Sequence, residues 1–106
     1  MNHINMGVAA YARSFGNSEK RLDEWCRTFG TSDMREEIIS LVKRIEDEIF
    51  ADIVNSNRSY EGKELEVLVR NACHARDPRI EKEGIAAILD YVAWICWHEG
   101  YLKREC

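Results

Sequence analysis

The apolar positions of this chain recur at helical spacing along almost its whole length. Residues at i, i+3, i+4 and i+7 share one face of an α-helix, whereas strand residues alternate with a period of two. Five segments carry the helical pattern, and breaks rich in Gly, Asn, Ser or Asp-Pro separate them. The segments are residues 4–15, 19–29, 33–55, 60–75 and 77–105, and Gly30 and Gly100 are expected to end the second and the last helix. The pattern predicts an all-α protein.

The last segment is expected to organise the others. It opens on Asp77-Pro78, where Asp can cap free N–H groups and Pro suits the first helical position. One side of its helical wheel is aliphatic, and Trp94, Trp97 and Tyr101 fall on the opposite side. The aliphatic stripe comprises Ile85, Ile88, Leu89, Val92, Ile95 and Cys96. A helix that is apolar on two sides is either wrapped by neighbours or presents its second side to a partner, and both alternatives stay open for the tryptophans.

Length and charge limit the possible functions. A chain of 106 residues suits one domain, residues 1–106, with a single modest core. We expect a compact bundle of about five helices with the C-terminal helix at its centre. The net charge of −4 is too mild for a DNA mimic and argues against nucleic-acid binding by charge alone. Neither a membrane-spanning run nor a signal peptide is evident, so the expected location is the cytoplasm, without membrane contact.

The cysteines give little indication of chemistry. Cys26, Cys73 and Cys96 lie on or beside apolar stripes, so they are expected to be buried free thiols, whereas Cys106 is expected to be exposed. Cys73 and Cys96 each have a nearby histidine, but the spacing is wrong for the common zinc sites. We therefore expect no metal site and no cofactor.

The acidic residues of the third segment resemble those of all-α nucleotide pyrophosphohydrolases, which hold magnesium with EExxE and ExxD motifs. Here Glu36-Glu37 is followed by Ser40 where the third glutamate should stand, and the motif that starts at Glu48 has its aspartate one place late. Magnesium needs several oxygen ligands in a near-octahedral arrangement. A degenerate magnesium-dependent phosphohydrolase is therefore kept as an alternative, and the primary expectation is a protein that is not an enzyme.

A basic stretch and the aromatic side of the last helix form the candidate binding surface. Aromatic rings beside cations can stack single-stranded bases while the cations hold phosphates, and the same residue types anchor protein interfaces. Arg70 and His74 also resemble the Arg–His motif of helical ribonucleases of the HEPN type, with one intervening residue too few. The candidate residues are Arg70, His74, Arg76, Arg79, Lys82, Trp97, Tyr101, Lys103 and Arg104.

In size, helical content, mixed charge and lack of catalytic motifs, the chain resembles the small anti-CRISPR proteins of phages. The resemblance implies a stoichiometric inhibitor that acts in the cytoplasm of a bacterial host cell. It would bind a CRISPR effector complex, with type I systems expected, or the single-stranded nucleic acid that the complex exposes, with DNA favoured. Anti-CRISPR proteins share no motif, so no residue is carried over. The alternative is an interaction module (an immunity protein, antitoxin or adaptor) that uses the acidic residues of 33–61. A monomer or a weak homodimer is expected.

Overall fold

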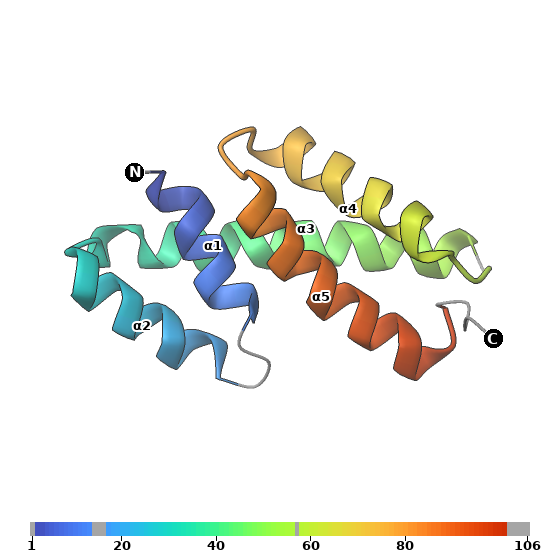
Figure 1. Ribbon diagram of the computed structural model, residues 1–106, viewed down its shortest axis with the longest axis horizontal. Coiled ribbons are helices and arrows are strands. Elements are labelled where there is room, and N and C mark those ends of the chain that lie inside the picture. The colour runs from blue at the N-terminus through green and yellow to red at the C-terminus, as the bar shows by residue number, and fades with distance from the viewer. Residues whose placement is uncertain (1, 14–16, 57, 102–106) are drawn as a thin grey trace.

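The computed structural model describes residues 2–13, 17–56 and 58–101 (Figure 1). The elements in these ranges are helical, so the all-α prediction is confirmed. They are α1 (His3–Arg13), α2 (Ser18–Phe29), a 3₁₀ turn (Ser32–Met34), α3 (Arg35–Ser56), α4 (Gly62–Arg76) and α5 (Lys82–Glu99).

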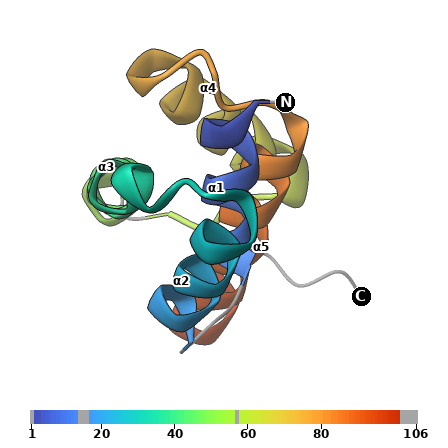
Figure 2. The same ribbon diagram turned by 90° about the vertical axis from the view of Figure 1, so that its left-hand side faces the viewer.

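Helix α3 is the axis of the molecule. Its 22 residues span about 33 Å of the 44 Å long dimension. Helices α1 and α2 cover one end of it, and α4 and α5 cover the other (Figure 1). Helix α1 also packs along α5, as the end view shows (Figure 2). The C-terminal helix α5 therefore contacts α1, α3 and α4, which agrees with the central position expected for it.

One apolar core joins the five helices, because each turns its predicted stripe inward. Full burial of one such aliphatic side chain contributes about 1.5–3 kcal/mol. The largest buried side chains are Val8, Leu22, Ile38, Val42, Ile45, Ile49, Ile53, Leu65, Val69, Ile80, Ile88 and Val92. On α5, Ala87 is fully buried whereas Ile85 and Leu89 are only partly so. On α2, Phe29 continues the helical spacing of the buried Leu22 and Cys26 but is 43% exposed.

Helix α5 does not begin at Asp77-Pro78, and that prediction is wrong. Asp77 is instead the residue that follows α4, and its backbone N–H bonds to the carbonyl of Cys73. Its carboxylate accepts the backbone N–H of Arg79 at 3.0 Å and the Arg79 Nε–H at 2.9 Å. Because this carboxylate is engaged within the turn, it does not cap the last helix, which starts at Lys82.

The N-terminus of α5 is capped from α1. The side-chain Oδ1 of Asn5 accepts the backbone N–H groups of Glu81 at 2.8 Å and Gly84 at 2.9 Å. The first N–H groups of a helix lack partners within the helix. Asn5 therefore supplies the acceptor that the sequence had assigned to Asp77.

The helix ends follow the glycines, as predicted. Gly30 and Gly100 have φ angles of 66° and 81°, in the left-handed region that favours glycine. Their N–H groups bond to the carbonyls of Cys26 and Cys96. The expected burial of Cys26, Cys73 and Cys96 is also confirmed, whereas Cys106 lies outside the described residues.

Candidate functional site

The predicted basic stretch does not form one positive patch. Arg76 pairs with Glu48 of α3, and Arg79 pairs with Asp77 at 2.7 Å and with Glu37 of α3 at 3.0 Å. Hydrogen bonding from Arg76 lowers the pKa of the Glu48 carboxyl, so this pair stays charged on both sides. Both arginines hold the end of α4 and the following turn against α3, and their charges are balanced by carboxylates.

Three other predicted residues meet in a cavity of about 530 Å³ between α4 and α5, which we call the α4–α5 cavity. Its lining includes Glu66, Arg70, His74, Glu81, Lys82 and Leu89. Arg70 bonds to Glu66 at 2.7 Å, one turn earlier on α4. Two acids thus balance Arg70 and Lys82, so the cavity brings the predicted residues together without a surplus of positive charge.

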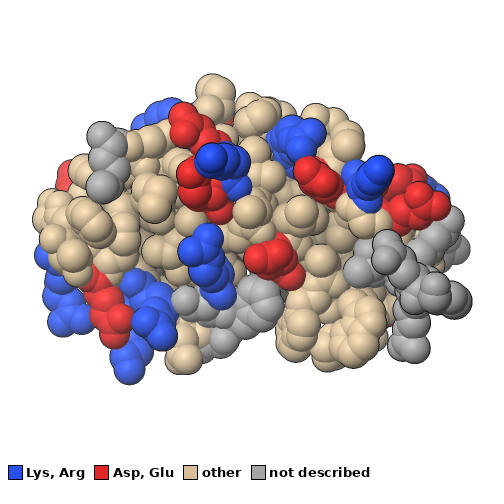
Figure 3. All heavy atoms as spheres, viewed as in Figure 1, with Lys and Arg blue, Asp and Glu red and all other residues tan. Residues whose placement is uncertain are grey.

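The aromatic side of α5 is open to solvent. Trp94 is 44% exposed and Trp97 is 50% exposed, so the alternative in which both are buried against other helices is wrong. The ring of His98 lies between them, with centroid distances of 4.3 Å to Trp94 and 4.9 Å to Trp97. The surface over the C-terminal half of α5 shows few charged side chains (Figure 3). We call Trp94, Trp97 and His98 the α5 aromatic surface.

The remaining predicted residues do not extend this surface into a basic one. Tyr101 is partly buried against the core, and its carbonyl accepts the N–H of Tyr60 at 2.6 Å. Lys103 and Arg104 lie outside the described residues. Lys82 and Trp97 stand at opposite ends of α5, about 22 Å apart along the helix axis. The cationic and aromatic parts of the prediction are therefore separate surfaces.

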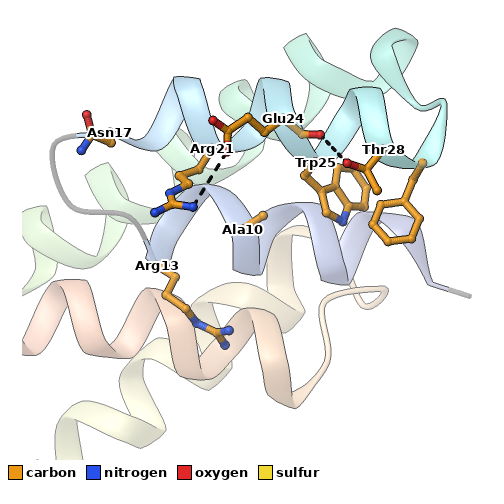
Figure 4. Close-up of a pocket in the computed structure, with 8 residues that line it drawn as sticks. Ala10, Arg13, Asn17, Arg21, Glu24, Trp25 and Thr28 are labelled. Carbon is orange, nitrogen blue, oxygen red and sulfur yellow. Dashed lines mark hydrogen bonds and ion pairs between the residues drawn. The ribbon is translucent and has the colours of Figure 1, made fainter.

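Sequence reasoning missed a groove between α1 and α2 (Figure 4). Arg13, Arg21, Trp25 and Phe29 line it, and its volume is about 590 Å³. The sequence does contain a signal for this groove, because Arg21, Trp25 and Phe29 are each four residues apart and so share one face of α2. The two aromatic residues also continue the helical spacing of Leu22 and Cys26, which is typical of a buried stripe, so the pattern alone does not reveal a groove. We call this feature the α1–α2 groove.

The carboxylates that resembled a magnesium site are engaged elsewhere. Glu37 and Glu48 pair with Arg79 and Arg76, and Glu36 pairs with Arg35. Over residues 2–13, 17–56 and 58–101, no three His, Cys, Asp or Glu side chains come together as a metal site would require. No helix within these ranges has the length and hydrophobicity needed to cross a membrane.

Comparison with protein families, curated proteins and solved structures found no match to this chain.

Proposed function

We propose that this protein is a non-enzymatic binding protein of the anti-CRISPR type, acting in the bacterial cytoplasm. Its partner is a protein component of a type I CRISPR effector complex, and its contact surface is the α5 aromatic surface. The observation that carries the proposal is the exposure of Trp94 and Trp97 on one regular helix. Tryptophan is enriched at the energetic centres of protein interfaces, and exposed apolar patches of this kind mark interaction sites.

Two features support this choice of surface. Trp94 and Trp97 are one turn apart, and the ring of His98 packs against both, so they are held in a defined arrangement before binding. The second feature is the state of Arg76 and Arg79, whose guanidinium groups already pair with carboxylates. Of the two alternatives that the sequence left open, protein binding therefore suits this part of the molecule better than binding of a phosphate backbone.

The test is the plating efficiency of a CRISPR-targeted phage on hosts with an active type I system that express the protein. The wild-type protein should restore plating. The double variant Trp94→Ala/Trp97→Ala should abolish the restoration, because truncating an interface centre costs about 2 kcal/mol or more, roughly a 30-fold loss of affinity.

The matched control removes apolar surface elsewhere. Val54 on α3 is 56% exposed and Val67 on α4 is 49% exposed. The Val54→Ala/Val67→Ala variant should restore plating as the wild type does. A wild-type protein that protects no phage from any type I system would overturn the proposed inhibitor role, and a fully active tryptophan variant would overturn the proposed surface.

A second candidate is phosphate binding in the α4–α5 cavity, favoured by the convergence of Arg70, His74 and Lys82. Here a nucleic-acid phosphate must compete with Glu66 for Arg70. An exposed ion pair contributes only about 0–1 kcal/mol, so replacing the Glu66 carboxylate by a phosphate as the partner of Arg70 costs little free energy. Single-stranded DNA binding that Lys82→Gln weakens would favour this candidate over the α5 aromatic surface.

A further inference from the structure

The α1–α2 groove differs from the α4–α5 cavity in its charge balance, because two arginines, Arg13 and Arg21, line it with one carboxylate, Glu24. Among the described residues, Arg13 forms no ion pair. Arg21 has only a loose contact to Glu24, at 3.8 Å, and both of these side chains are largely exposed. The space-filling view shows Lys and Arg side chains gathered over the α2 end of the molecule (Figure 3). The groove therefore has one more cation than carboxylate in its lining, a surplus that the α4–α5 cavity lacks.

Small residues of α1 create the apolar part of the groove. The six-membered ring of Trp25 lies over Gly7, where an added Cβ would come within 3.1–3.2 Å of the ring. Ala10, one turn further along α1, lines the groove next to it. Phe29 extends the aromatic wall, with its ring centroid 5.5 Å from that of Trp25. The ring of Phe29 is open to a ligand, because the residue is 43% exposed.

The two kinds of side chain occupy different parts of the groove. Arg13 and Arg21 lie to one side of Ala10, and Trp25 lies on the other (Figure 4). The Arg21 side chain projects from α2, whereas the Arg13 side chain points away from α2 (Figure 4). Arg21 and Trp25 are one helical turn apart on α2, about 6 Å along the axis. A ligand that matches this arrangement of arginines and aromatic rings carries an anionic group at one end and a planar ring at the other.

We propose that the α1–α2 groove binds a nucleoside phosphate unit. The guanidinium group of Arg21 binds the phosphate, because its planar fork matches phosphate oxygens, and Arg13 adds a second positive charge at the same end of the groove. The base stacks on the aromatic wall of Trp25 and Phe29, as bases do in proteins that bind single strands. This site is separate from the α5 aromatic surface and does not depend on the function proposed for it.

Fluorescence anisotropy of a short fluorescein-labelled oligothymidylate over a salt series tests the proposal. Arg13→Gln and Arg21→Gln should each reduce the salt dependence, lowering the slope of log K against log salt by about 0.7. Phe29→Ala should weaken binding roughly 5- to 150-fold, the equivalent of about 1–3 kcal/mol for one stacked base. The exposure of Phe29 makes this variant compatible with the fold.

Matched controls separate the groove from general effects. Arg44→Gln removes an exposed cation of α3, and Val67→Ala removes an exposed apolar side chain of α4, so both should bind as the wild type does. No binding at the lowest salt, or equal losses in Arg21→Gln and Arg44→Gln, would overturn the proposal.

Competition identifies the source of the nucleoside phosphate. Displacement of the labelled strand by thymidine monophosphate indicates a site for a free nucleotide. Displacement only by unlabelled oligothymidylate indicates a site for one unit of a strand. If inorganic phosphate competes as well as thymidine monophosphate, the base contributes nothing and the proposal is wrong.

Discussion

The side chain of Asn5 on α1 accepts the backbone N–H of Gly84 on α5 at 2.9 Å, although 79 residues separate them. The same Oδ1 accepts the N–H of Glu81, and the Asn5 amide donates to the Glu83 carboxylate at 2.9 Å. This hydrogen bond is the main reason why the pKa of Glu83 is lowered. Asn5 is buried, and its side-chain amide both accepts and donates hydrogen bonds to the start of α5. It therefore fixes where α5 begins and how α1 lies against it.

Replacing Asn5 by Ala should destabilise the fold by about 1–3 kcal/mol, because two N–H groups at the start of α5 lose their acceptor in a buried site. The free energy of unfolding in urea measures the effect. Asn71→Ala is the matched control, since Asn71 is exposed on α4 and should change stability by less than about 0.5 kcal/mol. Equal stability of the two variants would contradict the capping role.

Gly84→Ala should also be destabilising, by about 1–3 kcal/mol, because α1 approaches α5 closely at this position. An added Cβ would lie 2.8 Å from Ile80 Cγ2 and 3.0 Å from Asn5 Oδ1. The control is Gly62→Ala at the start of α4, where a Cβ meets no atom within 4 Å. Because Ala favours helix over Gly, that variant should be neutral or more stable in thermal unfolding. A stabilised Gly84→Ala variant would show that the two helices can separate freely.

Glu46 on α3 should make the protein less stable as the pH rises. Burial, aided by the nearby charge of Asp47, raises the pKa of Glu46 to about 7. Burial raises the pKa values of Tyr11, Cys73 and Tyr91, on the three helices around Glu46, and the charge of Glu46 raises them further. The folded state therefore holds the proton between about pH 4.5 and 7, where the unfolded chain has lost it, and stability falls across that window.

The Glu46→Gln variant removes this dependence. It should be more stable than the wild type by about 3 kcal/mol at pH 8 and equally stable at pH 4, as measured by urea unfolding. Asp52→Asn, which alters an exposed carboxylate of the same helix, should leave the pH profile in place. A wild-type stability that stays level between pH 4.5 and 7 would be inconsistent with the burial of Glu46.

The buried thiols should be inert in the folded protein. Burial raises the pKa of Cys73 to about 12, so at pH 8 only about one molecule in 10⁴ carries the thiolate. In a Cys106→Ser background, a thiol reagent such as DTNB should label Cys26, Cys73 and Cys96 only after denaturant is added. Rapid labelling of any of the three under native conditions would contradict their placement in the core.

Local patterns were sufficient to predict the helices of this protein. The apolar spacing of 33–55 and the positive-φ glycines at 30 and 100 act within a few residues, so they are readable along the chain. The first residue of α5 could not be predicted from the local sequence. It depends on Asn5, whose position relative to Glu81 exists only after folding. Asp77 satisfies the local rule for a helix cap, but Arg79 occupies its carboxylate.

The candidate site was harder to predict, because charge along a sequence does not show which charges pair in space. Arg76 and Arg79 are close to one another in sequence, and each finds its carboxylate on α3, 28 and 42 residues away. The exposure of the aromatic residues was equally hard to predict from their spacing. Phe29 has the spacing of a core residue yet is exposed, because it lines the groove between α1 and α2 and lies outside the core.

The most direct test of the proposed function measures binding of this protein to purified type I CRISPR effector complexes by biolayer interferometry, for the wild type and for two double variants. We predict that at least one of these complexes binds the wild type and Val54→Ala/Val67→Ala with equal affinity. The same complex should bind Trp94→Ala/Trp97→Ala at least about 30-fold more weakly. A folded Trp94→Ala/Trp97→Ala variant that binds as tightly as the wild type, or a wild type that binds none of the complexes, would contradict the account.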